Sequence, residues 1–395
     1  MNKRVFLIVL DSFGVGELKD ADKFNDQGSN TLLSVSKSKF FNSKNLSKLG
    51  LFNIDGVLDN SAFNPSLSVK SPLGAYAKMG ELSNGKDTTT GHYEIAGLLS
   101  PKPFPTYPNG FPKSVIDEFE RAIGTKTLCN KPYSGTEVIK DYGDEHLKTK
   151  YPIVYTSQDS VFQIACHDSV VPLEKLYEYS EIARKILKGE HAVGRVIARP
   201  FTGEYPFIRT PYRHDYALSP HGETMLDILC KNNLDCIAVG KIYDIFAGKT
   251  FTKSVKTLDN KDGMQKLKEI AKTSFNGLCF ANLVDFDSKY GHRNDADGYA
   301  KAISYFDEFL GEFMNELQGC DLLIITADHG CDPNTPSTDH SREYVPMLVY
   351  GKNVSANVNL GVRESFSDIS ATILEYFNLH KGATAGNSYL NKILK

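Results

Sequence analysis

The sequence predicts an α/β protein in which a mostly parallel sheet flanked by helices carries a second, smaller α/β domain as an insertion. Three observations lead to this prediction: short apolar runs recur along the chain, helical patterns separate several of them, and a proline-rich stretch interrupts the alternation. The chain has 395 residues, of which 41% are hydrophobic and 24% are charged. This length and composition are typical of a folded globular protein with two or three domains.

The expected strands of the main sheet are short runs that are rich in β-branched residues. They comprise residues 5–10, 236–239, 278–284, 322–326 and 347–350. Because helical patterns lie between several of these runs, the alternation predicts a mostly parallel sheet.

Two helices have clear patterns. The first is expected from about residue 297 to residue 317, because apolar residues repeat there at steps of three and four. Its expected buried face consists of Ile303, Phe306, Leu310, Phe313 and Leu317. Ser367 or Asp368 is expected to cap the second helix, which begins near them. This second helix carries Ile369, Ile373 and Phe377 on one side and is expected to pack on the sheet.

Residues 101–219 differ in character and are expected to form the inserted domain. The stretch opens with a cluster of prolines, and strand-like runs follow near 153–156 and 195–198. Linker-like segments bound it at both ends, and insertions are tolerated best where the two chain ends lie close together. The core domain is therefore expected to consist of two segments, 1–100 and 220–395.

Net charge and cysteine content exclude several classes of function. With 45 Lys and Arg against 48 Asp and Glu, the chain has no general positive field that would bind nucleic acid or an anionic membrane. No apolar run approaches the roughly 20 residues of a membrane helix, and the first residues lack the pattern of a secretory signal. The seven cysteines have no CxxC spacing, so we expect reduced thiols and a cytoplasmic protein.

Residues with chemical potential stand at the predicted strand ends, where open α/β sheets collect their functional groups. Asp11 ends the apolar run 5–10 and precedes a turn that contains glycine. Taken alone, this carboxylate is equally consistent with a functional group and with a residue that caps a helix or turn.

A polar segment from Asn84 to Glu94 contains Thr88, Thr89 and Thr90 and precedes an apolar run. Threonines in this place can cap a helix. They can also act as nucleophiles, because a hydroxyl at a helix start lies near backbone N–H donors and the positive end of the helix dipole. The segment by itself favours the cap.

Two further motifs combine carboxylates with histidines. Asp287 and His292 lie in a glycine-containing loop directly after one predicted strand. Asp328 and His329 stand at the end of another strand, and His340 lies eleven residues further on in a loop rich in Pro, Asn, Ser and Thr. Adjacent Asp and His at a strand end, with a further His nearby, are typical of a metal site.

Together with Asp11, these motifs supply three carboxylates and three imidazoles, enough for two partly open metal sites. Such mixed donors suit manganese, zinc or iron, whereas magnesium and calcium sites are normally dominated by oxygen. Two metal ions about 3.5–4 Å apart can hold both the attacking and the leaving oxygen of a phosphoryl displacement. In that setting a threonine hydroxyl becomes an effective nucleophile, which gives Thr88 a chemical role.

These motifs resemble the alkaline phosphatase superfamily, and more closely its phosphopentomutase members, over essentially the whole chain. The similar segments are 10–16, 86–92, 194–201, 285–287, 290–293 and 326–330. The family usually has Trp after the Gly-His pair of the second segment, whereas this chain has Tyr93 and contains no Trp. The resemblance implies an alkaline-phosphatase-like core with an inserted cap domain that closes over a sugar phosphate and determines specificity.

The resemblance also implies roles for single residues. Thr88 corresponds to the phosphorylated nucleophile, because it stands three residues before the Gly-His pair, and Thr89 and Thr90 are the alternatives. One metal ion is expected to bind Asp11, Asp328 and His329, with Thr88 as an additional ligand. The other ion is expected to bind Asp287, His292 and His340.

The expected substrate contacts belong mainly to the cap. They are Ser157, Val161, Arg195, Ile197, Arg209 and Lys241. Arg195 and Arg209 are expected to clamp the distal phosphate of the sugar together, because a planar guanidinium binds phosphate oxygens in pairs. Lys241 is expected to reach in from the core.

The implied reaction is the reversible interconversion of (deoxy)ribose 1-phosphate and (deoxy)ribose 5-phosphate. It implies a phospho-threonine enzyme, a bisphosphate intermediate, and glucose 1,6-bisphosphate as a primer. Manganese is the expected metal, although affinity order alone favours zinc. The alternative is a metal-dependent phosphatase or phosphodiesterase on the same scaffold. A phosphoglycerate mutase and a metal-binding protein without enzymatic activity are more distant alternatives.

Overall fold

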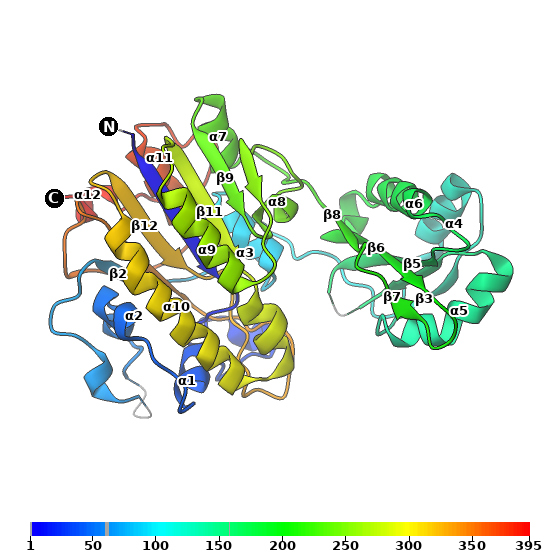
Figure 1. The fold of residues 1–395 in the computed structure, drawn as a ribbon, viewed down its shortest axis with the longest axis horizontal. Helices are drawn as coiled ribbons and strands as arrows, with labels where there is room; N and C mark the ends of the chain where they lie inside the picture. The colour runs from blue at the N-terminus through cyan, green and yellow to red at the C-terminus, as the bar shows by residue number, and fades with distance from the viewer. Residues whose placement is uncertain (1, 60–62, 158) are drawn as a thin grey trace. The chain divides into compact units, whose positions relative to one another are not determined.

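The computed structural model describes residues 2–59, 63–157 and 159–395. The chain folds into two compact units: unit 1 consists of Met1–Pro103 and Pro220–Lys395, and unit 2 consists of Phe104–Ser219 (Figure 1). The sequence predicted that the inserted domain starts at residue 101. In the structure, residues 101–103 belong to unit 1, and unit 2 begins at Phe104.

Unit 1 is built on an eight-stranded sheet with the strand order β10-β9-β11-β1-β12-β13-β2-β14. The five strands from β10 to β12 in this order are parallel, β13 is antiparallel to both of its neighbours, and β2 and β14 are parallel. The strands are β1 (Arg4–Leu10), β2 (Ala75–Met79), β9 (Asp235–Val239), β10 (Lys253–Val255), β11 (Gly277–Leu283), β12 (Asp321–Thr326), β13 (Val345–Tyr350) and β14 (Val358–Arg363). The mostly parallel sheet and its five predicted strands are thus confirmed.

The three central strands are buried along their whole length, as expected for apolar runs in a parallel sheet that is covered on both faces. Two groups of helices provide this cover (Figure 1): α10 packs with α1, α2 and α9, whereas α11 packs with α3 and α7. The helices of unit 1 are α1 (Thr31–Ser36), α2 (Lys44–Leu49), α3 (Thr88–Ile95), α7 (Met225–Lys231), α8 (Ile242–Ile245), α9 (Asn260–Ala271), α10 (Ala296–Glu316), α11 (Ser367–Tyr376) and α12 (Leu390–Ile393).

Both predicted helices of unit 1 are present, as α10 and α11, but the predicted cap of α11 is wrong. The N-cap residue is Phe366, which makes no side-chain cap hydrogen bond. Asp368 instead accepts hydrogen bonds from Arg363 Nε at 2.7 Å and from the backbone N–H of Asn387 at 2.6 Å. Its carboxylate is therefore committed to tertiary contacts that the local pattern does not reveal.

Unit 2 contains a six-stranded sheet in which β3, β4, β5, β6 and β7 follow one another and β8 also pairs with β6. The strands are β3 (Leu128–Pro132), β4 (Ile153–Thr156), β5 (Val161–His167), β6 (Arg195–Thr202), β7 (Ile208–Arg209) and β8 (His214–Ala217). The helices are α4 (Lys113–Ile123), α5 (Glu137–Thr149) and α6 (Leu173–Ile186). Side chains from α4 and α6 form one apolar core with the sheet, and side chains from α5 form another. Unit 2 is therefore an α/β domain with its own interior.

All seven cysteines are free thiols. Within the described ranges, the structure contains no helix that combines the length and apolar character needed to cross a membrane.

Candidate metal centre

The acidic and histidine motifs meet at the carboxyl end of the central strands. Strand β1 pairs in parallel with both β11 and β12, with Leu10 opposite Leu283 and Val9 opposite Thr326. Because these three strands end at the same edge of the sheet, the residues that follow them emerge side by side. This register brings together segments that are about 270 to 320 residues apart in the sequence.

The first cluster consists of Asp11, Asp328 and His329. Their ligand atoms all lie within 4.8 Å of one another, and each side chain is at most 1% exposed. His329 Nε2 is 3.5 Å from Asp11 Oδ1 and 3.4 Å from Asp328 Oδ2. The structure thus brings together the three residues expected at one metal ion.

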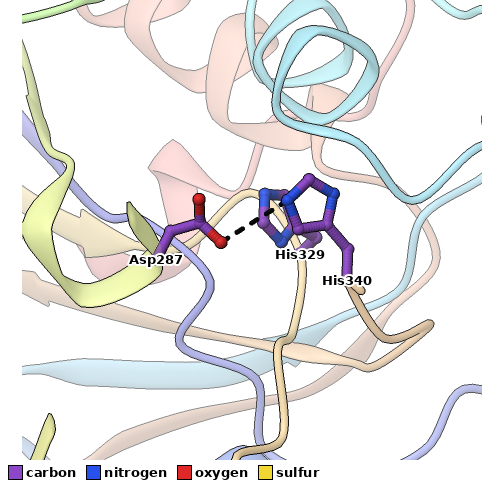
Figure 2. Close-up of side chains that lie close together, drawn as sticks. All are labelled: Asp287, His329 and His340. Atoms are coloured by element: carbon purple, nitrogen blue, oxygen red, sulfur yellow. Dashed lines mark ion pairs between the residues drawn. The ribbon is translucent and has the colours of Figure 1, made fainter. Parts of the chain in front are cut away.

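The second cluster consists of Asp287, His292 and His340. Asp287 Oδ2 lies 3.2 Å from His292 Nε2, Asp287 Oδ1 lies 3.4 Å from His340 Nε2, and the two imidazole nitrogens are 3.1 Å apart. The clusters adjoin, because Asp287, His329 and His340 also form a group within 4.8 Å (Figure 2). The rings of His329 and His340 are only 4.0 Å apart between centroids.

The protonation pattern of these residues fits bound cations. Within the two clusters, three buried carboxylate oxygens make no hydrogen bond: Asp11 Oδ1, Asp287 Oδ1 and Asp328 Oδ2. His329 Nδ1 lies 3.0 Å from its acceptor, the carbonyl of Gly330, so the neutral ring presents a lone pair at Nε2 toward two of these oxygens. His292 Nδ1 likewise donates to the carbonyl of Thr338 at 2.6 Å. A divalent cation is the group that satisfies lone pairs converging from oxygen and nitrogen.

Electrostatics lead to the same conclusion. Burial, together with the negative charges of Asp328 and Asp287, raises the pKa of Asp11 well above its usual value. A positive charge beside Asp11 lowers its pKa again. The nearby Lys241 supplies part of this charge, but the pKa of Asp11 stays raised. The donor set is mixed carboxylate and imidazole, which suits manganese, zinc or iron.

Thr88 is the first residue of α3, and Asp87 is the N-cap of this helix. Asp87 Oδ1 accepts from the backbone N–H groups of Thr89 and Thr90 at 3.0 and 3.1 Å, and Oδ2 accepts from Thr90 Oγ1 at 2.6 Å. The threonines therefore do not cap the helix, which answers the alternative that the sequence left open. Thr88 Oγ1 lies 3.2 Å from His329 Nε2, next to the first cluster.

A glycine allows this close approach of α3. A Cβ atom at Gly91 would lie 2.1 Å from the carbonyl oxygen of Asp328. A larger residue would therefore push the first turn of α3, and Thr88 with it, away from the first cluster.

The structure also shows site residues that the sequence motifs did not identify. Asn282, a polar residue inside the apolar strand β11, donates from Nδ2 to Asp11 Oδ2 at 2.9 Å. The Nδ1 atom of His92 lies 3.1 Å from Asp328 Oδ2. Arg342 donates to the carbonyl groups of Ser83 and Gly85 and so fixes the loop before Thr88. A buried polar residue in an apolar run is the one signal that could have pointed to Asn282.

Four of the expected substrate contacts lie together in unit 2. Ser157 follows β4, Val161 begins β5 and Arg195 begins β6, with Val161 and Arg195 directly opposite each other. Ile197 lies two residues along β6, on the same face as Arg195. Lys241 belongs to unit 1, where it immediately precedes α8.

The backbone of Arg209 lies at the opposite end of β6 from that of Arg195. It pairs with Phe201 at the far end of β6, which puts the two arginine backbones about 20 Å apart along the strand. Their partners also differ, because Arg209 Nε donates to the carbonyl of Gly135 at 3.2 Å whereas Arg195 Nη1 faces Asp215 at 3.6 Å. The backbones of the two arginines thus lie at opposite ends of β6, although the charge of Arg209 also acts on Arg199, and their shared binding of one phosphate stays a prediction.

Two arginines that the motifs did not single out accompany Arg195. Arg213 makes two hydrogen bonds of 2.6 Å to Asp215, on the strand that pairs with β6. Arg199 lies on the same face of β6 as Arg195, and burial together with the charge of Arg213 lowers its pKa to about 10. Asp215 and Asp159 both lie 3.6 Å from Arg195, so three arginines beside two aspartates leave this group in unit 2 with an excess of positive charge.

Comparison with known proteins agrees with this geometry. Residues 3–381 match the family model of the metalloenzyme superfamily. The phosphopentomutase of Lachnoclostridium phytofermentans is 58% identical over 394 residues, and that of Carboxydothermus hydrogenoformans is 57% identical over 395 residues; both matches cover 100% of each chain. Among solved structures, the PH0037 protein from Pyrococcus horikoshii aligns with 98% of this chain and 99% of its own, at 14% identity and a TM-score of 0.48. With full-length identity at this level, the chain belongs to the metalloenzyme superfamily and, within it, to the phosphopentomutases, which are isomerases of the intramolecular phosphotransferase class.

Proposed function

We propose that the protein interconverts ribose 1-phosphate and ribose 5-phosphate, and the corresponding 2-deoxyribose phosphates, through a phosphorylated Thr88. The observation that carries this proposal is the hydroxyl of Thr88, which lies 3.2 Å from His329 between a helix N-terminus and two adjoining clusters of metal-binding side chains. The name of the relatives and their 57–58% identity support the choice of substrate. We also propose that the enzyme works in the cytoplasm on these small molecules.

Two divalent ions, for which manganese is our choice, belong to this proposal. Asp11, Asp328 and His329 are proposed to hold one ion, with Thr88 as a further ligand. Asp287, His292 and His340 are proposed to hold the other. When bound, such ions neutralise charge on the phosphoryl oxygens and favour ionisation of a coordinated hydroxyl.

One priming transfer precedes the proposed cycle, which itself has two phosphoryl transfers. In the priming step the Thr88 hydroxyl loses its proton and attacks a phosphoryl group of a sugar bisphosphate such as glucose 1,6-bisphosphate, and the sugar oxygen that leaves takes up a proton to give a sugar monophosphate. The free hydroxyl of the bound pentose phosphate then attacks the phosphorus of phospho-Thr88, loses its proton and forms a pentose bisphosphate. Thr88 next attacks the other phosphoryl group, and the sugar oxygen that leaves takes up a proton. The first transfer of the cycle frees the Thr88 oxygen, and the second transfer restores phospho-Thr88 for the next pentose phosphate.

Unit 2 is proposed to recognise the sugar phosphate as a cap domain. Ser157, Val161, Arg195 and Ile197 form a group at one end of its sheet, and Arg199 and Arg213 extend the positive charge beside Arg195. Arginine suits phosphate because its planar guanidinium offers paired donors. Arg209, whose charge acts on Arg199, and Lys241 of unit 1 are further proposed contacts.

The test is incubation of the purified protein with ribose 1-phosphate, manganese and glucose 1,6-bisphosphate, followed by phosphorus NMR. We expect the ribose 5-phosphate signal to grow until equilibrium, and the initial rate to depend on the primer. Release of inorganic phosphate without ribose 5-phosphate would instead identify a phosphatase on this scaffold. Intact mass after primer treatment detects the covalent phosphoryl group, which a protein that only binds metal does not acquire.

A further inference from the structure

We propose that His92 and Asn282 are positioning residues that join Asp11, Asp328 and the Thr88 turn into one chain of hydrogen bonds and close polar contacts and thereby determine how tightly the first cluster binds its ion. This inference rests on the proposed function, because it takes Asp11, Asp328 and His329 as the ligands of one ion. Neither residue is among the proposed ligands, and both are buried, with exposures of 0% and 2%.

His92 touches two parts of the site through one nitrogen. Its Nδ1 lies 2.8 Å from the carbonyl oxygen of Thr88 and 3.1 Å from Asp328 Oδ2. Both of these atoms are acceptors, so Nδ1 carries the proton. The ring stacks on Phe280 of β11, with centroids 5.8 Å apart and an interplanar angle of 25°. The imidazole is therefore held in one orientation between α3 and the sheet.

Asn282 connects the other ring nitrogen to Asp11. Its Nδ2 donates to Asp11 Oδ2 at 2.9 Å and lies 3.2 Å from His92 Nε2. If the Asn282 amide were turned over, its oxygen would face the Asp11 carboxylate, and two acceptors would meet. The amide nitrogen of Asn282 therefore faces Asp11. Nε2 of His92 consequently accepts, which agrees with the proton placed on Nδ1 from the other end of the chain. Each donor in the chain therefore meets an acceptor.

The chain leaves each carboxylate with one oxygen directed away from its anchoring donor. Asp11 has Oδ2 hydrogen-bonded to Asn282 and Oδ1 without a hydrogen bond. Asp328 has Oδ1 hydrogen-bonded to the backbone N–H of Ser12 at 3.1 Å, and its Oδ2 makes no hydrogen bond but lies 3.1 Å from His92 Nδ1. Asp11 Oδ1 and Asp328 Oδ2 are the oxygens that face His329 Nε2. Donors that fix carboxylate and histidine ligands in this way affect metal affinity about 10- to 100-fold.

Substitutions at His92 can separate the contacts made by its Nδ1 atom from the contact made by its Nε2 atom. Asn places an amide near the Nδ1 position and keeps a donor for Thr88 and Asp328, whereas Gln places an amide near Nε2 and loses that donor. Asn282→Ala removes the donor to Asp11 from the opposite end. We expect His92→Gln and Asn282→Ala to weaken one of two manganese ions about 10- to 100-fold, and His92→Asn to weaken it less.

The experiment is a manganese titration of the metal-free full-length protein, read by electron paramagnetic resonance of the free ion, with circular dichroism to establish folding. His146→Gln is the matched control, because His146 is also fully buried, with Nδ1 bonded to Tyr151 and Nε2 accepting from His167, but lies in unit 2. We expect this control to bind both ions as the unmodified protein does.

The outcomes distinguish this inference from the proposed function. If the unmodified protein does not bind two ions, the proposed metal sites fail, and the positioning role fails with them. If it binds two ions and both His92 variants and Asn282→Ala retain both affinities, the inference alone is overturned. Equal losses for His92→Asn and His92→Gln, or equal weakening of both ions, would also overturn it, because a purely structural role predicts no such selectivity. Should His92→Gln not fold, the comparison of Asn282→Ala with His92→Asn decides.

Discussion

Thr88 is distinguished from its two neighbours by where its hydroxyl lies. Thr90 Oγ1 donates to Asp87, and the backbone N–H groups of Thr89 and Thr90 are used by the same cap, whereas Thr88 Oγ1 faces His329. The hydroxyl best placed for phosphoryl transfer is therefore not the one that stabilises the helix. This separation allows the proposed nucleophile to be removed without removing the cap.

Replacement of Thr88 by Ala is expected to lower mutase turnover at least about a thousandfold, because it deletes the proposed nucleophile. Folding and the stabilisation by manganese should largely remain, since Asp87 still caps α3. Peptide mapping of primer-treated enzyme checks the position of the phosphoryl group. Its detection on Thr89 or Thr90 would contradict the assignment, and loss of folding in Thr88→Ala would indicate a structural role instead.

The two clusters are expected to respond separately to single substitutions. Asp328→Asn neutralises a proposed ligand of the first ion, and His340→Ala removes a proposed ligand of the second, so each variant should bind close to one ion in place of two. Elemental analysis of the purified variants measures the stoichiometry. Phosphorylation of Thr88 by primer should be lost in Asp328→Asn. Two retained ions with unchanged turnover would disprove the ligand assignment.

At the scale of elements, α5 of unit 2 contains a buried histidine that makes stability depend on pH. Burial lowers the pKa of His146, although its bond to the carbonyl of Tyr151 opposes this, and the charge of His167 adds to the effect. The folded protein therefore keeps this imidazole neutral at a pH where the unfolded chain, with a pKa of about 6.5, takes up a proton. The unfolded state binds more protons, so the free energy of unfolding must fall as the pH decreases below that value.

The expected slope from this one group is at most about 1.4 kcal/mol per pH unit, between the pKa of the unfolded chain and the lower pKa of the folded protein. Urea unfolding of the unmodified protein and of His146→Gln, above and below pH about 6.5, measures it. The variant should lose less stability on acidification, because Gln does not titrate. Identical losses in both proteins would show that His146 does not contribute. Carboxylates affect both proteins alike and cancel in the comparison.

At the scale of the whole molecule, the two units have separate cores and different charged groups. The carboxylates and histidines of the proposed chemistry belong to unit 1, whereas the group of arginines belongs to unit 2. A substitution in unit 2 can therefore affect recognition of the sugar phosphate without changing the phosphoryl-transfer residues. Activity on a substrate without a distal phosphate separates the two effects.

Arg195→Ala is expected to lower mutase activity on ribose 5-phosphate about 10- to 100-fold, as expected for a lost hydrogen bond between charged groups. Slow hydrolysis of a small aryl phosphate should change much less, because that substrate offers no second phosphate. Arg121, an exposed arginine on α4 of unit 2, is the control, and Arg121→Ala should change neither activity. Equal losses of both activities in Arg195→Ala would mean that Arg195 supports folding rather than specificity.

The sequence alone predicted the central strands and the residues that follow them, because both depend on local patterns. An apolar β-branched run forms a buried strand wherever it occurs, and the polar residues after it must lie at a strand end. The same logic predicted the mostly parallel sheet and α10. Six residues of the two clusters could thus be proposed before their distances were known.

Other features depend on contacts between distant segments, which a local pattern does not contain. Asp368 does not cap α11, because Arg363 and Asn387 engage its carboxylate. Arg195 and Arg209 are fourteen residues apart in sequence, yet the strand register sends them to opposite ends of β6. Asn282 and His92 gain their partners only because β1, β11, β12 and α3 pack side by side. The sequence by itself therefore determined which residues stand at the strand ends, and tertiary packing alone decided which of them meet, since register and burial are properties of the assembled sheet.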